Sequence, residues 1–177
     1  MKEGLENNVI HLGWGGEINW ADVRFDQFDT IKGTWREIVD PAATNQDANI
    51  VTMGTFRAAM QVGDYVIVSE GRDLIRAVGR IEGDYRYQAG VEHPHRRAVT
   101  WLWKGDEPVP RAPIYGRNFR QHSVYQLAPE AINWEMLDAL VYEEGLADGT
   151  GGKPHVLIID EVNRANISKV FGELITL

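Results

Sequence analysis

Two adjacent carboxylates, Asp160 and Glu161, follow a short apolar run late in the chain. The run, Val156 to Ile159, has the length and the β-branched composition of a buried strand. In open α/β sheets, ligands bind at the carboxyl ends of the strands. Two carboxylates at that position suit a nucleoside triphosphate, because one can hold Mg²⁺ and the other can orient a water for attack. The alternative is a buried strand that ends in a solvated acidic turn.

The residues around this pair point to a known motor. The strand followed by Asp160 and Glu161 has the pattern of a Walker B element, and the run DEVNRANISKVFGELITL resembles that region of McrB-type AAA+ NTPases, the motor subunits of modification-dependent restriction systems. The resemblance implies that Asp160 is the Mg²⁺-side carboxylate, that Glu161 is the catalytic one, and that residues 168–177 form the next helix. A complete member of that family would bind GTP and Mg²⁺, form a ring and work with an endonuclease subunit of the McrC type.

A phosphate-binding loop is missing from the sequence. P-loop NTPases carry G-x-x-x-x-G-K-[ST], and no such run occurs in the 177 residues. The glycine cluster at 149–153 has a different spacing and is typical of a linker. We therefore expect that this chain alone needs no nucleotide cofactor and does not hydrolyse GTP or ATP, and that a ring requires a complete AAA+ module.

Composition bounds the class of protein. A chain of 177 residues that is 44% apolar can bury one good core. The absence of cysteine excludes a disulfide scaffold and a thiolate zinc site, and it fits a cytoplasmic location. No long apolar run begins the chain, so we expect neither a signal peptide nor a membrane partner.

Charge is distributed unevenly along the chain. The net charge is −8, but residues 72–122 contain 10 Lys/Arg and 6 Asp/Glu, a net charge of +4. The segments on either side, 1–71 and 123–177, each carry −6. A basic middle between acidic flanks suits a local nucleic-acid footprint, and equally an arginine-rich solvated face.

Hydrophobic periodicity predicts the elements that position these residues. Strands are expected at 9–12, 65–68, 74–81, 97–103, 123–127 and 156–159. Helices are expected within 19–39, at 49–60 and at 129–144, and a proline-rich loop with Pro108, Pro110 and Pro113. We predict an α+β domain over residues 1–145 with a curved or barrel-like sheet and flanking helices. A glycine-rich linker (146–154) and a separate strand-helix fragment (155–177) would follow.

Aromatic residues beside arginines are the best candidates for a binding site. Trp14 lies in a Gly-Trp-Gly-Gly loop, where glycines let the backbone approach a ligand closely. Tyr85 and Tyr87 flank Arg86 after a predicted strand end. Such a set suits a base lifted out of its stack, with rings on its faces and cations on its phosphates. The phosphate-contact candidates are Arg86, Arg96, Arg97, Arg117 and Arg120. Packing in the core is the alternative for Trp14.

The histidines and the remaining tryptophans are weaker candidates for a functional site. His93 and His95 flank Pro94, but no third ligand at a recognisable spacing accompanies them. We therefore expect one solvated and one hydrogen-bonded histidine and no metal other than the Mg²⁺ of a complete motor. Trp101 and Trp103 alternate on a predicted strand and are expected to pack.

Four runs within about residues 9–127 carry a second resemblance. HLGWGG, FRAAMQVGDYVIV, DLIRAVGRIEGDYRY and HPHRRAVTWLW resemble the EVE/YTH branch of the PUA-like fold, in particular the versions at the N-termini of McrB-like NTPases. The resemblance implies a small β-barrel with flanking helices that holds a modified base in an aromatic pocket. Trp14 matches the cage aromatic after the first strand, and Tyr85 or Tyr87 the second. YTH readers typically have tryptophan at that second place, so the accepted base is left open.

Both resemblances lead to the same expectation. We expect a DNA-recognition domain of a McrB-type modification-dependent restriction system, which flips a methylated cytosine or adenine into the cage. The first alternative is a piece of a GTP-hydrolysing motor with Asp160 and Glu161 as its site. The others are an RNA-binding PUA-like domain and an interaction module whose aromatic residues are all core.

Overall fold

The computed structural model describes residues 2–13, 18–120, 122–142 and 156–160. The described strands are β1 (Val9–Leu12), β2 (Tyr65–Glu70), β3 (Leu74–Ile81), β4 (Arg86–Tyr87), β5 (His95–Pro110), β6 (Val124–Gln126) and β7 (Val156–Asp160). The α-helices are α1 (Lys2–Glu6), α2 (Phe28–Ile38), α3 (Ala48–Gly54) and α4 (Trp134–Tyr142). The 3₁₀ helices η1 (Val23–Asp26) and η3 (Pro129–Ala131) and the π-helix η2 (Thr55–Ala59) complete the elements.

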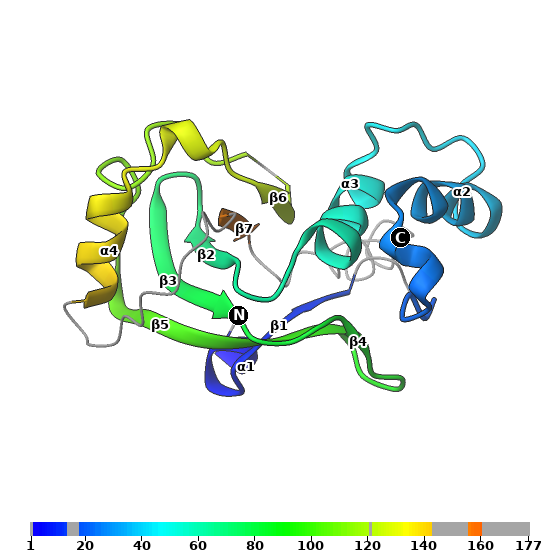
Figure 1. Cartoon of the computed structure of the whole chain (residues 1–177), viewed down its shortest axis with the longest axis horizontal. Coiled ribbons are helices and arrows are strands. Elements are labelled where there is room, and N and C mark those ends of the chain that lie inside the picture. The colour runs from blue at the N-terminus through cyan, green and yellow to red at the C-terminus, as the bar shows by residue number, and fades with distance from the viewer. Residues whose placement is uncertain (1, 14–17, 121, 143–155, 161–177) are drawn as a thin grey trace, which may run out of the picture.

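The strands form a single curled sheet in the order β1-β5-β3-β2-β7-β6, and β4 also pairs with β5. Neighbouring strands are antiparallel except β2 and β7, which are parallel. Figure 1 shows the sheet as a half-barrel, with α2 and α3 at one end and α4 at the other. The predicted α+β class and the curved sheet with flanking helices are therefore confirmed.

Irregular pairing and one glycine account for the curvature of the sheet. The register shifts in β2 after Val68, and again between Ile75 and Ala77 where β3 pairs with β5. Such shifts bend a strand and increase its twist. At Gly79, a Cβ atom would lie 2.6 Å from a methyl carbon of Val99. A glycine at this position lets β3 and β5 approach closely where the sheet turns.

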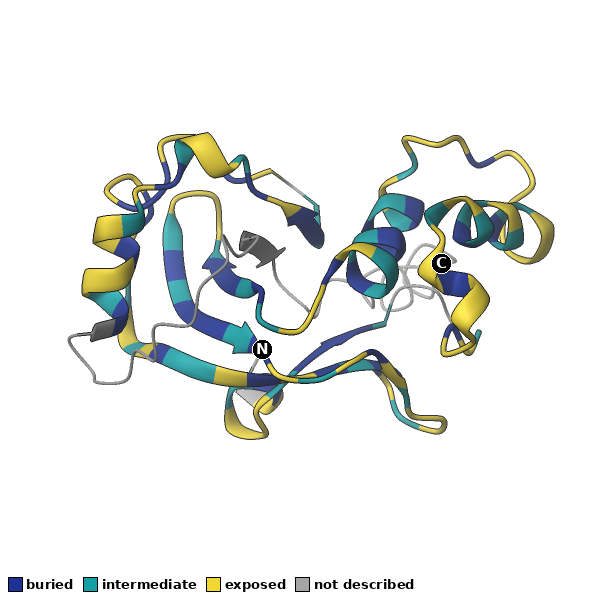
Figure 2. Ribbon diagram, in the orientation of Figure 1, coloured by how far each residue is buried: buried dark blue, intermediate teal, exposed yellow. Residues whose placement is uncertain are grey.

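Two hydrophobic cores lie on the two faces of the sheet. Successive side chains of a strand point to opposite faces, so Val66 of β2 packs in the first core and Ile67 in the second. The first core lies under η1, α2 and α3 and includes Trp20, Phe25, Ile31, Trp35, Ile50, Met53 and Phe56. The second lies against α4 and includes Trp103, Ile114, Tyr115, Phe119, Tyr125, Leu127 and Leu137. Figure 2 shows the buried positions concentrated in the strands and in α3, and the exposed ones along α2, α4 and the connecting loops.

The long strand β5 contributes to both cores. Val99 packs in the first and Trp103 in the second, and Trp101 packs partly buried against the first. The expectation that both tryptophans pack is therefore confirmed. The strand also runs beyond its predicted end into the expected proline loop. Pro108 and Pro110 are two residues apart, so their missing N–H donors fall on one side of the strand and the other side stays free to pair with β3.

The helix predicted at 129–144 is divided by a tertiary contact. Ile132 forms an isolated bridge with Tyr115, and the Asn133 N–H donates to the carbonyl of Ile114 at 2.8 Å. The chain is therefore extended between η3 and α4. The Asn133 side chain then accepts from the N–H of Met136 at 3.2 Å, which begins α4. The helix predicted at 49–60 is α3 followed directly by the wider turn of η2.

The strand predicted at 156–159 forms, as β7, inside the sheet. It pairs in parallel with β2, Tyr65 opposite Val156, and antiparallel with β6. The sequence predicts a separate fragment here. In the structure, β7 instead pairs with the backbone N–H and C=O groups along the edge of β2 that does not face β3. The predicted linker at 146–154, Glu161 and the helix at 168–177 lie outside the described residues.

Candidate functional site

A polar cleft lies at the helical end of the sheet. It has a volume of about 320 Å³ and is lined by Ala21, Val23, Asp26, Arg57, Asp84, Tyr85 and Arg97. These residues come from η1 and the turn before it, from η2, from the turn after β3, and from β5. Segments far apart in the sequence thus surround an aromatic ring with two guanidinium groups and two carboxylates.

Arg57 on η2 fixes one wall of the cleft. Its Nη1 atom lies 2.6 Å from Oδ1 of Asp26, and its Nε donates to the carbonyl of Trp20 at 2.6 Å. The Nη2 atom donates to the carbonyl of Asp22 at 3.1 Å. One side chain therefore holds the turn before η1, and η1 itself, against η2. The guanidinium carbon also lies 5.4 Å from the centre of the Tyr85 ring, within range of a cation–π contact.

Arg97 on β5 provides a second, deeper cation. The side chain is 3% exposed, and its Nε donates to the carbonyl of Phe56 at 2.9 Å. Its two terminal nitrogens donate to the carbonyls of Arg57 at 3.1 Å and Gly83 at 3.3 Å. Burial, and then the nearby Arg57 charge, lower the pKa of Arg97 to about 10, while Asp84 acts in the opposite direction. The group therefore stays cationic at neutral pH and makes the floor of the cleft positive.

Tyr85 supplies a rigid aromatic wall. It is 8% exposed, and its hydroxyl lies 2.6 Å from Nδ1 of His95, in a buried hydrogen bond. The ring stacks on His95 with centroids 5.9 Å apart and meets Phe56 edge-on. Burial raises the pKa of the Tyr85 hydroxyl well above its ordinary value, so the ring stays neutral. Tyr87 also contacts this histidine in a tilted arrangement, with ring centroids 5.6 Å apart.

The structure separates the predicted site residues into groups. Tyr85 and Arg97 line the cleft, whereas Tyr87 is not among its lining residues and contacts His95. Arg86 is exposed on β4, and Arg96 donates to the carbonyl of His93 and to the Glu3 carboxylate.

Two of the predicted arginines lie far from the cleft. Arg117 pairs with Glu130, and the Arg120 guanidinium lies over the Tyr125 ring. Both belong to the segment between β5 and β6, which Figure 1 places toward α4. They therefore cannot share one small ligand with Tyr85.

The remaining predictions concern Trp14, the carboxylate pair and the histidines. Trp14 lies outside the described residues, as does Glu161, and Asp160 is the last residue of β7. Among the described residues, no group of His, Asp or Glu could hold a metal ion. His95 is hydrogen-bonded as expected, but His93 is 7% exposed, so the expectation of a solvated histidine is wrong.

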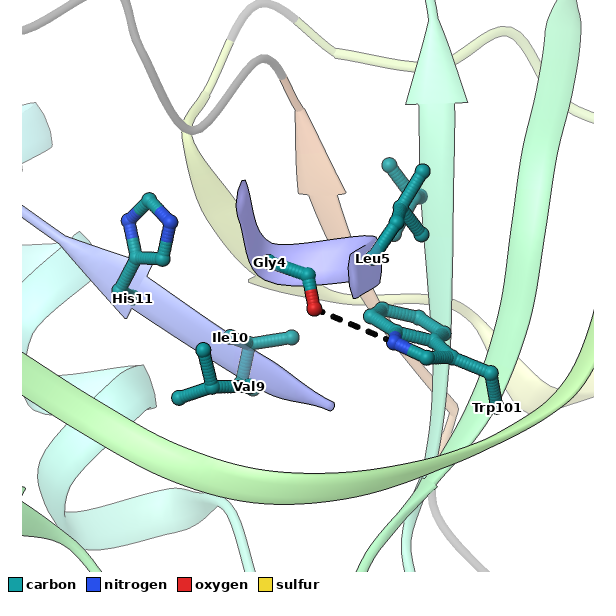
Figure 3. A pocket seen from close by; sticks show the side chains of 7 residues that line it. Gly4, Leu5, Val9, Ile10, His11 and Trp101 are labelled. Atoms are coloured by element: carbon teal, nitrogen blue, oxygen red, sulfur yellow. Dashed lines mark hydrogen bonds between the residues drawn. The ribbon is translucent and has the colours of Figure 1, made fainter. Parts of the chain in front are cut away.

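A second pocket, small and mostly apolar, lies between α1 and the sheet (Figure 3). The indole N–H of Trp101 donates to the carbonyl of Gly4 at 3.3 Å and so ties α1 to β5. His11 faces this pocket from β1 and is 2% exposed, with no hydrogen-bond partner for either ring nitrogen in the described part of the chain. Its ring centre lies 4.7 Å from that of His93. This pocket has too little space and polarity for a polar ligand.

The described helices include none with the length and apolar character that crossing a membrane demands. The model of a family described as a domain of unknown function, DUF8426, matches residues 1–128. The chain belongs to this family. Every residue that lines the polar cleft lies within the part of the chain that matches DUF8426, residues 1–128. Comparisons with curated proteins and with solved structures gave no match.

Sequence reasoning selected Tyr85 and Arg97 for the cleft but missed Arg57, Asp26 and Asp84. The sequence did offer one indication of Arg57, because this arginine belongs to the run FRAAM, which lies directly before the turn into β2. Nothing local, however, indicated that η2 approaches the turn after β3. The cleft is made by that approach, which is a property of the folded domain.

Proposed function

We propose that this DUF8426 domain recognises a modified base in DNA and takes the flipped base into the polar cleft. The observation that carries the proposal is the combination of the fixed Tyr85 ring with the Arg57 and Arg97 cations in one concave site. A flipped base is held by stacking on aromatic rings and by hydrogen bonds to its edge. The cleft volume is near the lower end of the roughly 300–1,000 Å³ usual for small-ligand sites, which suits one base.

The fold is compatible with this function. A curled sheet with flanking helices is consistent with a PUA-like barrel of the EVE/YTH type, and we propose that type for the DUF8426 part. Trp14 follows β1 by two positions in the sequence and would be the second ring of the cage. Arg86, which is exposed on β4, would contact the phosphates of the flanking strand.

The wider setting belongs to the same proposal. The domain would serve as the specificity module of a cytoplasmic, McrB-type restriction system with a nuclease subunit of the McrC type. GTP and Mg²⁺ would be cofactors of complete members that carry a phosphate loop. The alternative, a piece of the motor itself, would be supported by Mg²⁺-dependent GTP hydrolysis by this chain.

The test is a binding titration by fluorescence anisotropy at fixed moderate salt. Matched duplexes are unmodified or carry one 5-methylcytosine, 5-hydroxymethylcytosine or N6-methyladenine. We expect one modified duplex to bind at least tenfold more tightly than the unmodified one. Trp14→Ala should lose roughly tenfold or more of that affinity, because stacking one base on a ring contributes about 1–3 kcal/mol.

Two arginine variants serve as controls. When the titration is repeated at several salt concentrations, Arg86→Ala should lower the salt dependence by about one charge for every duplex without changing the preference. Arg117 lies toward α4, so Arg117→Ala should change neither the salt dependence nor the preference for the modified duplex. Equal affinity for all four duplexes would refute the proposal, and tighter binding to unmodified RNA would favour an RNA-binding function instead.

A further inference from the structure

Asp84 differs from the other polar residues of the cleft, because its charge raises the pKa of Arg97 but no hydrogen bond in the described part of the chain fixes its side chain. It lies in the turn between β3 and Tyr85, is exposed, and lines the cleft. Within the described residues its carboxylate makes no hydrogen bond or ion pair. The other carboxylate of the cleft, Asp26, is held by Arg57 at 2.6 Å.

The arginine donors of the cleft are partly committed to the protein, because three of the five N–H groups of each guanidinium contact it. Each of the three nitrogens of Arg57 contacts Asp26 or a backbone carbonyl. Each of the three nitrogens of Arg97 donates to a carbonyl. The Tyr85 hydroxyl is bonded to His95. Among the described residues that line the cleft, Asp84 supplies the carboxylate that no hydrogen bond or ion pair occupies, and a carboxylate accepts hydrogen bonds from a ligand.

A carboxylate is an unusual group to leave open in a site for nucleic acid. It repels phosphates, so it does not help the backbone to bind. It is useful against the edge of a base, where aspartate accepts hydrogen bonds from an amino group. Cytosine and adenine present such an amino group, whereas thymine presents a carbonyl oxygen at the equivalent place. A carbonyl opposite Asp84 would bring two acceptors together and leave both without a partner.

We propose that Asp84 selects bases that carry an exocyclic amino group, the derivatives of cytosine and adenine, and rejects derivatives of uracil. The inference rests on the proposed function and specifies its substrate class. A base that is methylated once on the amino nitrogen keeps one N–H and is accepted. A base that is methylated twice there has lost both and is rejected.

The test compares bases that differ at the edge that Asp84 reads. The first pair is 5-methylcytosine and thymine, and the second is 5-hydroxymethylcytosine and 5-hydroxymethyluracil. For adenine, the pair is N6-methyladenine and N6,N6-dimethyladenine. Each base is placed opposite an abasic position, so that differences in pairing strength do not affect the cost of flipping. Affinities are measured by anisotropy at one salt concentration.

The wild-type domain should bind the N–H-bearing member of its preferred pair roughly ten- to a hundredfold more tightly. Asp84→Asn should bring that ratio to within about twofold, because an amide both accepts and donates. The loss of a negative charge will raise affinity for every duplex, so the ratio is the quantity to compare. Asp106→Asn, an exposed carboxylate toward the far end of β5, removes the same charge and should keep the ratio.

The outcomes separate this inference from the proposed function. A ratio that survives in Asp84→Asn would overturn the role of Asp84. A wild-type domain that prefers a modified base over its unmodified form, yet binds both members of each pair equally, would also overturn it and leave the proposed function standing. Equal binding to every duplex, including the unmodified one, would refute both. Because Asp84 is exposed, the variant should unfold at the wild-type temperature, which a thermal melt checks.

Discussion

Acid should destabilise this domain through one buried histidine. His11 has no hydrogen-bond partner for its ring nitrogens in the described part of the chain, and burial lowers its pKa from 6.5 to about 4. Electrostatic interactions with His93 and Arg96 lower this pKa further, and the interaction with Glu3 raises it. The unfolded chain therefore takes up a proton near pH 6.5 that the folded domain refuses until about pH 4. Stability is present above pH 6.5 and is lost as the pH falls between these values.

The size of the loss follows from the two pKa values. Each unit of difference corresponds to 1.36 kcal/mol, so His11 alone should lower the free energy of unfolding by about 2.5 kcal/mol between pH 7 and pH 4.5. Urea denaturation followed by tryptophan fluorescence at pH 7, 5.5 and 4.5 measures this quantity. His11→Leu keeps an apolar group in the site and should remove this share of the pH dependence.

The comparison of variants decides the result. Titrating groups that do not interact with His11 contribute equally to the wild type and to His11→Leu, so the difference in slope reports His11 together with its coupling to His93 and Glu3. His122→Gln removes an imidazole elsewhere and controls for the loss of a histidine as such. If His11→Leu lost stability with acid as steeply as the wild type, the reasoning about the buried ring would be refuted.

Three further changes test the packing around the cleft. Gly54→Ala would place its Cβ 1.5 Å from a ring carbon of Phe28, so thermal melts should show a loss of about 1–3 kcal/mol or more. Tyr85→Phe removes the hydroxyl bonded to His95 and should cost about 1 kcal/mol in urea titrations while the ring keeps its affinity for a base. Arg97→Met leaves three carbonyls without their donor and should cost about 3 kcal/mol or more, seen as a large fall in melting temperature.

Local pattern was sufficient to predict the strands other than β4. Residues 65–68 form a short continuous apolar run and residues 97–103 alternate between two faces, and neither pattern needs knowledge of the rest of the chain. The errors occur where a distant contact decides the local structure. Ile132 is extended because it bridges Tyr115, and β5 continues to Pro110 because β3 is there to pair with it. Neither partner can be recognised from the segment itself.

For the candidate site too, the residue types could be predicted from the sequence, but the positions of the side chains in the folded chain could not. Tyr85 and Arg97 could be chosen because an aromatic and a cation near a strand end suit nucleic acid. The sequence does not reveal that the carbonyls of Phe56 and Arg57 reach the Arg97 guanidinium, which turns an expected surface cation into a buried one. Asp84 was missed for a related reason, since an acidic residue in a turn is unremarkable until its neighbours are known to be paired.

The position of β7 has a consequence for how copies of this chain can associate. Among the described strands, β6 is joined to the sheet through β7 alone. Removing β7 would expose the backbone N–H and C=O groups along one edge of β2 and would detach β6. Such an edge is a template for any strand that fits it. Each hydrogen bond that β7 makes within its own chain is one that the same strand of a second copy can make equally well, which is the condition for domain swapping.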